Sequence, residues 1–203
     1  MRLLLIRHGE TDANRKGLAL GRADVSLNDI GVLQTRALGR RLANERIAAV
    51  YSSPLERAVR TAEAVAAPHG IGVAIHDGLI EMDVGEIDGL PFSEVRVRHP
   101  GLLERWTSAD GPSHPMPGGE ALADVAMRAW DTAMGFSKHH RDETIAAVTH
   151  NFVILSLLTR VMGIDLANFR RLRHGLAAVT VLEFRRDRAR VLALNDGCHL
   201  NVE

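Results

Sequence analysis

The run Leu3-Leu4-Leu5-Ile6-Arg7-His8-Gly9-Glu10-Thr11 places a charged, glycine-containing turn directly behind an apolar stretch. Four consecutive apolar residues are typical of a strand that is buried on both faces, as in parallel sheets. Open α/β sheets bind ligands beyond the carboxyl ends of their strands. The sequence therefore predicts that Arg7 and His8 lie at a ligand-binding edge, where a neutral imidazole can attack an anionic centre.

Strand and helix patterns alternate along the rest of the chain. Apolar runs predict further strands at 48–51, 72–75 and 144–148, and two late strands, near 176–184 and 189–195, that can pair as a hairpin at an edge. Helical spacing predicts helices over 28–44, 54–67, 120–138 and 151–162, with Ser26 and Ser53 as the N-caps of the first two. This alternation predicts a three-layer α/β/α sandwich around a mostly parallel central sheet.

Residues 76–119 interrupt that alternation. They are richer in Gly, Pro and Asp than their surroundings, and short helices are expected near 91–98 and 100–107. The interpretation is a small lid inserted into one domain that spans residues 1–203, a length suited to a single core.

Composition excludes several classes of protein. Lys+Arg and Asp+Glu both number 25, so the chain has no overall basic field for a nucleic acid. Cys198 is the single cysteine, which rules out an intrachain disulfide framework. The first apolar run is too short for a signal sequence, and no stretch approaches the roughly 20 apolar residues of a membrane span. A cytoplasmic protein with neither nucleic-acid nor membrane partners is expected.

A second histidine is predicted to lie near the first. His150 follows the strand at 144–148, and the carboxyl ends of parallel strands meet at the same edge of a sheet. The candidate set at strand and turn ends is Arg7, His8, Asn14, Arg57, Glu81 and His150. Two guanidinium groups beside two imidazoles suit phosphate, because guanidinium binds oxygen pairs bidentately and keeps its charge.

The segment Arg7–Thr11 resembles the signature of the histidine phosphatase superfamily, also called phosphoglycerate-mutase-like. Five further blocks resemble the family's in the same order, over roughly residues 1–155: 14–34 (with Asn14 and Gly21-Arg22-Ala23-Asp24-Val25-Ser26-Leu27), Ser52-Ser53-Pro54-Leu55-Glu56-Arg57-Ala58, Leu79-Ile80-Glu81, Pro117-Gly118-Gly119-Glu120 and Val148-Thr149-His150. One pentapeptide is moderate support for a family, whereas ordered blocks are strong support.

The resemblance implies a role for each matching residue. His8 would be the phosphorylated nucleophile, Arg7, Arg57 and His150 would hold the phosphoryl oxygens, and Glu81 would donate and accept the proton. Substrate contacts are also expected from Asn14, Gly21 and Asn151. The implied activity is a metal-independent phosphomonoesterase that needs no cofactor and acts on a small phosphorylated metabolite. A homodimer is a possible assembly.

Two alternatives stay open. A phosphoglycerate-type mutase usually has a basic residue after the acid-base glutamate, but Met82 and Asp83 follow Glu81 here, which favours net hydrolysis. A non-catalytic module that binds phosphate esters is the other.

Sugar phosphates, phosphoserine and ribazole phosphate all fit the resemblance as substrates. The run 170–174, which ends in His174, is most simply a solvated face, with recognition of an acidic substrate as the alternative. A neutral nucleophile and a protonated acid together predict a bell-shaped pH profile.

Overall fold

A six-stranded sheet forms the centre of the computed structural model, which describes residues 1–185 and 188–200. The strands are β1 (Arg2–Arg7), β2 (Ile47–Ser52), β3 (Val73–Ile75), β4 (Thr144–Thr149), β5 (Val179–Arg185) and β6 (Arg188–Asp196), in the order β3-β2-β4-β1-β5-β6. The pairs β1–β4, β2–β4 and β2–β3 are parallel, whereas β5 is antiparallel to β1 and to β6. The predicted late hairpin is confirmed, and β6 is an edge strand.

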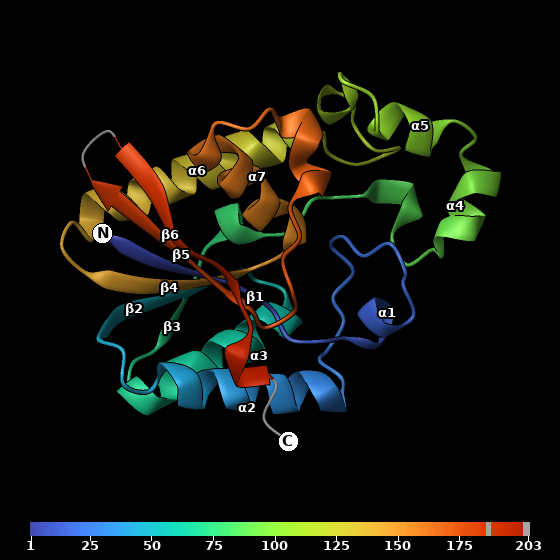
Figure 1. Cartoon of the computed structure of the whole chain (residues 1–203). Coiled ribbons are helices and arrows are strands. Elements are labelled where there is room, and N and C mark those ends of the chain that lie inside the picture. The colour runs from blue at the N-terminus through green and yellow to red at the C-terminus, as the bar shows by residue number, and fades with distance from the viewer. Residues whose placement is uncertain (186–187, 201–203) are drawn as a thin grey trace.

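Helices cover both faces of this sheet (Figure 1). Helices α2 (Asp29–Leu42) and α3 (Glu56–Ala66) lie on the lower face in that view, and α6 (Leu122–His139) and α7 (Asn151–Met162) lie on the upper face. The structure confirms the predicted α/β/α layers and the mostly parallel sheet. The predicted strand and helix positions agree with the observed ones to within a few residues at each end.

Alternation along the strands supplies both cores. Leu3 and Leu5 of β1 pack into the core beneath α6 and α7, while Leu4 and Ile6 pack into the core with α2 and α3. All four side chains are fully or almost fully buried. A continuous apolar run thus serves two faces at once, as expected for a central strand of a doubly covered sheet.

Short elements lie beyond the carboxyl ends of β1 and β4 (Figure 1). Helix α1 (Asp12–Arg15), which sequence patterns did not predict, follows the turn after β1. Helices α4 (Phe92–Arg98) and α5 (Leu102–Trp106) match the two short helices expected within residues 76–119. The described residues also include six 3₁₀ segments: Ala67–His69, Asp77–Leu79, Gly85–Ile87, Gly111–Ser113, Leu166–Arg171 and Cys198–Leu200.

The start of α2 differs from the prediction. Asn28, not Ser26, is the N-cap, since its side chain accepts from the Gly31 N–H at 2.8 Å. The Ser26 hydroxyl instead donates to Glu56 at the start of α3. Asn28 directly precedes the helix, where an Asx side chain reaches the third helical N–H.

Helix α2 buries only some of its large apolar residues, namely Leu38 and Leu42. Ile30 and Leu33 are 47% and 57% exposed, and small residues such as Gly31 and Thr35 face inward instead. A Cβ on Gly31 would lie 2.1 Å from the Glu10 carbonyl oxygen, and one on Gly9 would lie 2.8 Å from the Gly31 carbonyl oxygen. The small residues let the helix backbone press directly against the turn that carries His8.

The start of α3 needs a similar correction. Leu55 is the N-cap residue and makes no side-chain capping bond, so the helix begins two residues later than Ser53-Pro54 suggests. The Ser53 hydroxyl accepts a hydrogen bond from the Leu55 N–H, but it also reaches across to β4. This serine therefore joins two segments of the fold rather than only starting a helix.

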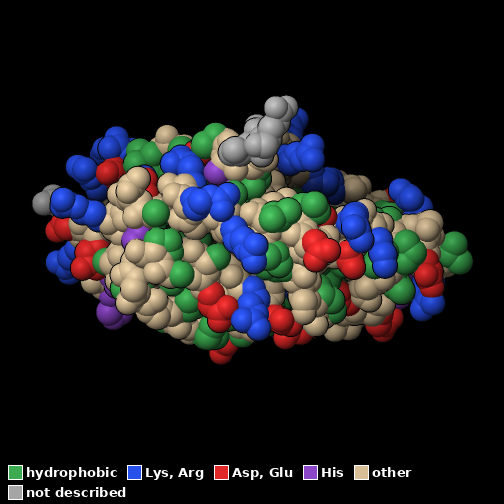
Figure 2. All heavy atoms as spheres, turned by 90° about the horizontal axis from the view of Figure 1, so that it is seen from below, with side chains coloured by type: hydrophobic (Ala, Val, Ile, Leu, Met, Phe, Trp, Pro, Cys, Tyr) green, Lys and Arg blue, Asp and Glu red, His purple; other side chains and the backbone are tan. Residues whose placement is uncertain are grey.

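Neither positive nor negative charge dominates the face of the molecule that points downward in Figure 1. Figure 2 shows acidic and basic side chains mixed with apolar and uncharged ones over this face. Within residues 1–185 and 188–200, no helix combines the length and apolar character needed to cross a membrane.

Candidate active site

Two histidines meet where β1 and β4 end. The His8 N–H donates to the Thr149 carbonyl at 3.1 Å, which continues the parallel pairing of the two strands beyond their last residues. The His8 and His150 rings lie 5.1 Å apart between centroids, at 54° to each other, and both residues are buried. The structure therefore brings together the two histidines that strand ends predicted to be neighbours.

The His8 ring is held with one nitrogen free of the backbone. Its Nδ1 donates to the Gly9 carbonyl oxygen at 2.7 Å, which places the proton of the neutral ring on Nδ1 and leaves the lone pair on Nε2. Burial lowers the pKa of His8 well below its usual 6.5, and the charges of Arg57 and Arg7 act in the same direction. A neutral imidazole with an available Nε2 is the form that can act as a nucleophile.

Two buried arginines approach the same region from different elements. Arg57, in the first turn of α3, donates from its terminal nitrogens to the carbonyls of Gly21 at 2.7 Å and Ala23 at 2.8 Å. Arg7 donates to the His174 carbonyl at 2.7 Å. Burial lowers the pKa of both guanidinium groups, yet arginine keeps its charge at any physiological pH. Backbone carbonyls thus orient both cations.

His150 sits at the N-cap position of α7, but its side chain makes no capping bond. Its Nε2 lies 2.7 Å from the Ser53 hydroxyl. Because that hydroxyl already accepts from the Leu55 N–H, its own hydrogen is free to point to Nε2. The proton of His150 then resides on Nδ1. Burial lowers the pKa of His150 well below 6.5, so the ring is neutral.

Three buried nitrogens of this cluster have no hydrogen-bond partner within the described residues: Arg7 Nε, Arg57 Nε and His150 Nδ1. A buried N–H without a partner costs free energy, and native proteins seldom leave one unpaired. Two of these groups belong to cations and all three lie on residues around the His8 ring. Their chemistry fits a tetrahedral anion that accepts several hydrogen bonds at once.

Glu81 carries the carboxyl group of the site. Burial raises its pKa above the usual 4.5, although N–H bonds from Met82 and Phe152 and the charges of Arg57 and Arg7 oppose the change. Arg128 of α6 holds the backbone here, since it donates to the carbonyls of Ile80 at 2.6 Å and Glu81 at 3.1 Å. A buried carboxyl of raised pKa can hold a proton and release it to a leaving group.

One pocket of about 540 Å³ joins most of these groups. Its polar and charged lining includes Arg7, His8, Asn14, Arg57, Glu81 and Asn151. Asn14 turns its side-chain oxygen back to the Thr11 N–H and hydroxyl, which leaves its NH₂ group as the available donor. Gly21 does not line the pocket in the described structure. Its N–H donates to Asp88 and its carbonyl accepts from Arg57, so its substrate contact stays a prediction.

The structure corrects two expectations around this pocket. Arg170 lines it, and His174 is buried, with its Nε2 at 2.9 Å from the Thr180 hydroxyl, so the interpretation of 170–174 as a solvated face is wrong, and Arg170 lies where the alternative interpretation requires it. The sequence predicts Ser53 as a helix cap, but the structure also gives it a contact with His150. Its neighbour Arg57 marked the segment as functional, but no sequence signal indicates that a serine in β2's exit loop reaches His150.

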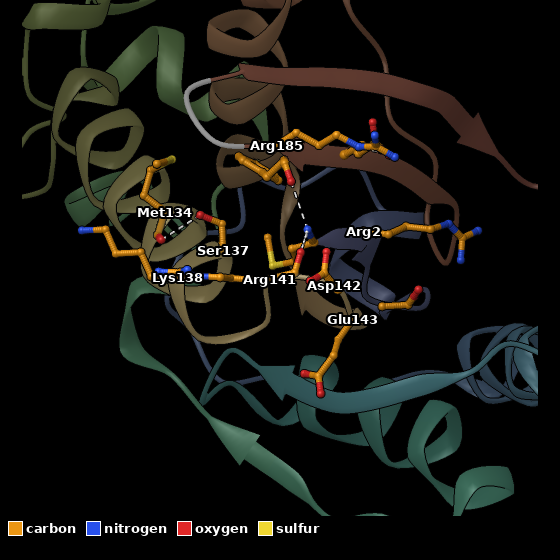
Figure 3. A pocket seen from close by; sticks show the side chains of 12 residues that line it. Arg2, Met134, Ser137, Lys138, Arg141, Asp142, Glu143 and Arg185 are labelled. Atoms are coloured by element: carbon orange, nitrogen blue, oxygen red, sulfur yellow. Dashed lines mark hydrogen bonds and ion pairs between the residues drawn. The ribbon is translucent and has the colours of Figure 1, made fainter.

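A second, larger pocket of about 910 Å³ lies at the opposite ends of the same strands. Figure 3 shows Arg2, Lys138, Arg141, Asp142, Glu143 and Arg185 around it, from the start of β1, the end of α6, the segment before β4 and the end of β5. Both cationic and acidic side chains line this pocket. None of the described residues that line it is a histidine or cysteine, and none belongs to the candidate set.

Comparisons with known proteins agree with this geometry. The model of the histidine phosphatase superfamily (branch 1) matches residues 3–197. Phosphoserine phosphatase 1 of Hydrogenobacter thermophilus is 30% identical over 200 residues, which cover 98% of this chain and 94% of that protein.

Two solved structures are also similar. YhfR of Bacillus stearothermophilus superposes with a TM-score of 0.92 at 28% identity and covers 98% of this chain and 99% of its own. A mycobacterial glucosyl-3-phosphoglycerate phosphatase in complex with VO3 gives a TM-score of 0.86 at 27% identity, covering 96% and 98%.

Proposed function

Because the chain belongs to the histidine phosphatase superfamily and is a phosphatase, we propose that it hydrolyses small phosphate monoesters through a phosphohistidine formed on His8. The observation that carries this proposal is the group of three buried nitrogens on Arg7, Arg57 and His150 that find no partner in the described part of the chain and lie beside a neutral histidine ring. Such a group offers the phosphoryl oxygens preorganised hydrogen bonds in a water-poor site.

The first step is attack of His8 Nε2 on phosphorus. The bond from phosphorus to the ester oxygen breaks, and the leaving alkoxide takes the proton of Glu81 to become the free alcohol. The phosphoryl group is then bound to Nε2, and the single N–H proton of the ring, on Nδ1, still donates to the Gly9 carbonyl. The raised pKa of Glu81 supports this role, because the carboxyl must be protonated when the ester binds.

The second step returns the enzyme to its starting state. Glu81, now a carboxylate, takes a proton from a water molecule whose oxygen attacks the phosphorus of phospho-His8. Inorganic phosphate leaves, His8 is neutral again and Glu81 is protonated again. The sum is one ester and one water giving one alcohol and one phosphate, with no proton unaccounted for.

The alternatives make different products. A mutase returns an isomerised ester without free phosphate. The residue after Glu81 offers such a reaction no cation, because it is Met82, which is fully buried in the core. A binding module holds an ester without forming phosphohistidine.

The names of relatives put phosphoserine among the candidate substrates. A cytoplasmic location and a homodimer stay predictions from the sequence.

The proposal is tested with 4-nitrophenyl phosphate in the presence of a chelator. We expect release of phosphate, an acid-labile phosphoenzyme in rapidly quenched samples, and loss of both in His8→Ala. His139→Ala, which removes an exposed histidine at the end of α6, is the control and should retain turnover. Undiminished turnover in His8→Ala would overturn the proposal.

A further inference from the structure

The pocket around His8 and Glu81 has a mainly apolar wall. Trp106 of α5, Phe152 of α7 and Phe169 of the 3₁₀ segment Leu166–Arg171 all line it. Their rings form one cluster, with centroids 5.4 Å apart for Trp106–Phe152, 5.7 Å for Trp106–Phe169 and 6.1 Å for Phe152–Phe169. Three segments far apart in the sequence thus build one aromatic surface beside the reacting groups.

Aliphatic side chains continue this wall on the other segments. Leu18 and Leu20 contribute from the loop after α1, and Leu103 contributes from α5. Phe92, the first residue of α4, also lines the pocket and is 46% exposed. A leaving group that fills the pocket therefore removes apolar surface from water on several sides, which stabilises the complex in proportion to the area covered.

The pocket offers little to a cationic leaving group. Among the described residues that line it, Glu81 alone carries a carboxylate, and the proposed chemistry requires that group to be protonated when the ester binds. An ammonium group placed here would lose water without gaining an ion pair, and it would lie near the cations Arg7 and Arg57. Burying a charge without a partner is strongly unfavourable.

The arginines at the pocket wall do not change this conclusion. Arg170 donates to the Thr107 carbonyl at 3.2 Å and lies over the Phe169 ring at 5.4 Å, so it ties the segment after α5 to the aromatic cluster. Arg96 lines the pocket from an exposed position on α4. Both cations attract a phosphate dianion and repel an ammonium group.

From these observations, and resting on the proposed phosphatase function, we propose that the enzyme selects phosphate monoesters of flat, apolar alcohols. An ester whose alcohol carries an ammonium group and no carboxylate, such as phosphoethanolamine, is then a poor substrate. The aromatic cluster and Phe92 supply the binding energy for the leaving group, while the phosphoryl contacts are the same for all esters.

The test compares primary alkyl esters, so that the intrinsic reactivity of the leaving group changes little. We expect kcat/KM for 2-phenylethyl phosphate to exceed that for phosphoethanolamine by on the order of a hundredfold, the effect of an unpaired polar group in a binding site. Phe92→Ala should reduce this preference by about tenfold. Val97→Ala, on the same helix but 78% exposed and outside the pocket, should leave it unchanged.

The outcomes separate the two proposals. Equal or faster turnover of phosphoethanolamine would overturn the selectivity for apolar alcohols while leaving the phosphatase function intact. An unchanged preference in Phe92→Ala would also count against the apolar wall as its source. If neither these esters nor 4-nitrophenyl phosphate are hydrolysed, the proposed function itself has failed, and the selectivity with it.

Discussion

The Ser53 hydroxyl lies 2.7 Å from Nε2 of His150 and joins the loop after β2 to the end of β4. Removing it in Ser53→Ala frees the His150 ring to change tautomer or rotate. We expect kcat/KM to fall roughly fivefold, equivalent to about 1 kcal/mol for one hydrogen bond, with the fold intact. Ser53→Thr keeps the hydroxyl and should recover most of the activity.

Ser156→Ala is the matched control for this change. Ser156 is buried on α7, and its hydroxyl has no hydrogen-bond partner among residues 1–185 and 188–200. The kcat/KM of Ser156→Ala should equal that of the unchanged enzyme. If Ser53→Ala behaves like Ser156→Ala in steady-state kinetics, the hydroxyl does not position His150.

Arg57→Lys should be far more damaging than its conservative chemistry suggests. The guanidinium group bonds to the Gly21 and Ala23 carbonyls and still has Nε for an anion, whereas one ammonium group cannot reach all three positions. We expect kcat/KM to fall by about 10²–10³, as for loss of a transition-state donor, and inhibition by vanadate to weaken.

The control for this variant lies on the same helix. Arg60→Lys changes an arginine whose side chain is 62% exposed and pairs only with Glu56 and Glu63 among the described residues. It should show unchanged kinetics. Vanadate inhibition that is equal in Arg57→Lys and Arg60→Lys would contradict the proposed contact.

The pH dependence of kcat follows from the opposite shifts of two buried groups. His8 must be neutral, and its lowered pKa moves the acid limb to below pH 6.5. Glu81 must be protonated, and its raised pKa moves the alkaline limb to above pH 4.5. We expect a bell-shaped profile with a broadened top in the acidic-to-neutral range, measured at saturating ester.

Glu81→Gln identifies the alkaline limb. The amide cannot donate a proton, so kcat should fall by about 10²–10⁴ and the residual rate should no longer decline above the optimum. An alkaline limb that persists unchanged in Glu81→Gln would assign it to another group.

His174 makes stability depend on pH. Burial lowers its pKa from 6.5 to about 4, so the unfolded chain binds more protons than the folded one between these values. His174 therefore leaves the free energy of unfolding at its full value above pH 6.5 and lowers it as the pH falls toward 4. The pKa shift corresponds to a loss of about 3 kcal/mol in the free energy of unfolding, since one pKa unit is about 1.4 kcal/mol.

Urea unfolding at pH 7 and pH 4 measures this contribution. The loss of unfolding free energy on acidification should be smaller in His174→Gln by about 3 kcal/mol. The exposed His139→Gln should lose as much as the unchanged protein. Equal losses in all three proteins would refute the assignment to His174.

The sequence predicted the pair of buried histidines better than their surroundings. His8 and His150 follow apolar runs, and parallel pairing of β1 with β4 brings such positions together whatever the loops do. The contacts of Ser53 and Arg170 depend on loop conformation and on the packing of a segment from the other half of the chain. No local spacing encodes those contacts.

The error in α2 has a different cause. Hydrophobic periodicity assumes that large apolar side chains mark the buried face. Here the buried face is partly Gly31 and Thr35, because the neighbouring turn leaves no room for larger groups, and Ile30 and Leu33 are left in contact with solvent.

The close approach of Gly31 to Glu10 affects how a mutational scan of every position would be interpreted. Any side chain at Gly31 must displace the backbone of Glu10, two residues from His8, because a Cβ there overlaps a carbonyl oxygen. Inactivating changes at this position would resemble those at His8, although the side chain of Gly31 is only a hydrogen atom. A position can thus be intolerant because of the volume it must leave empty.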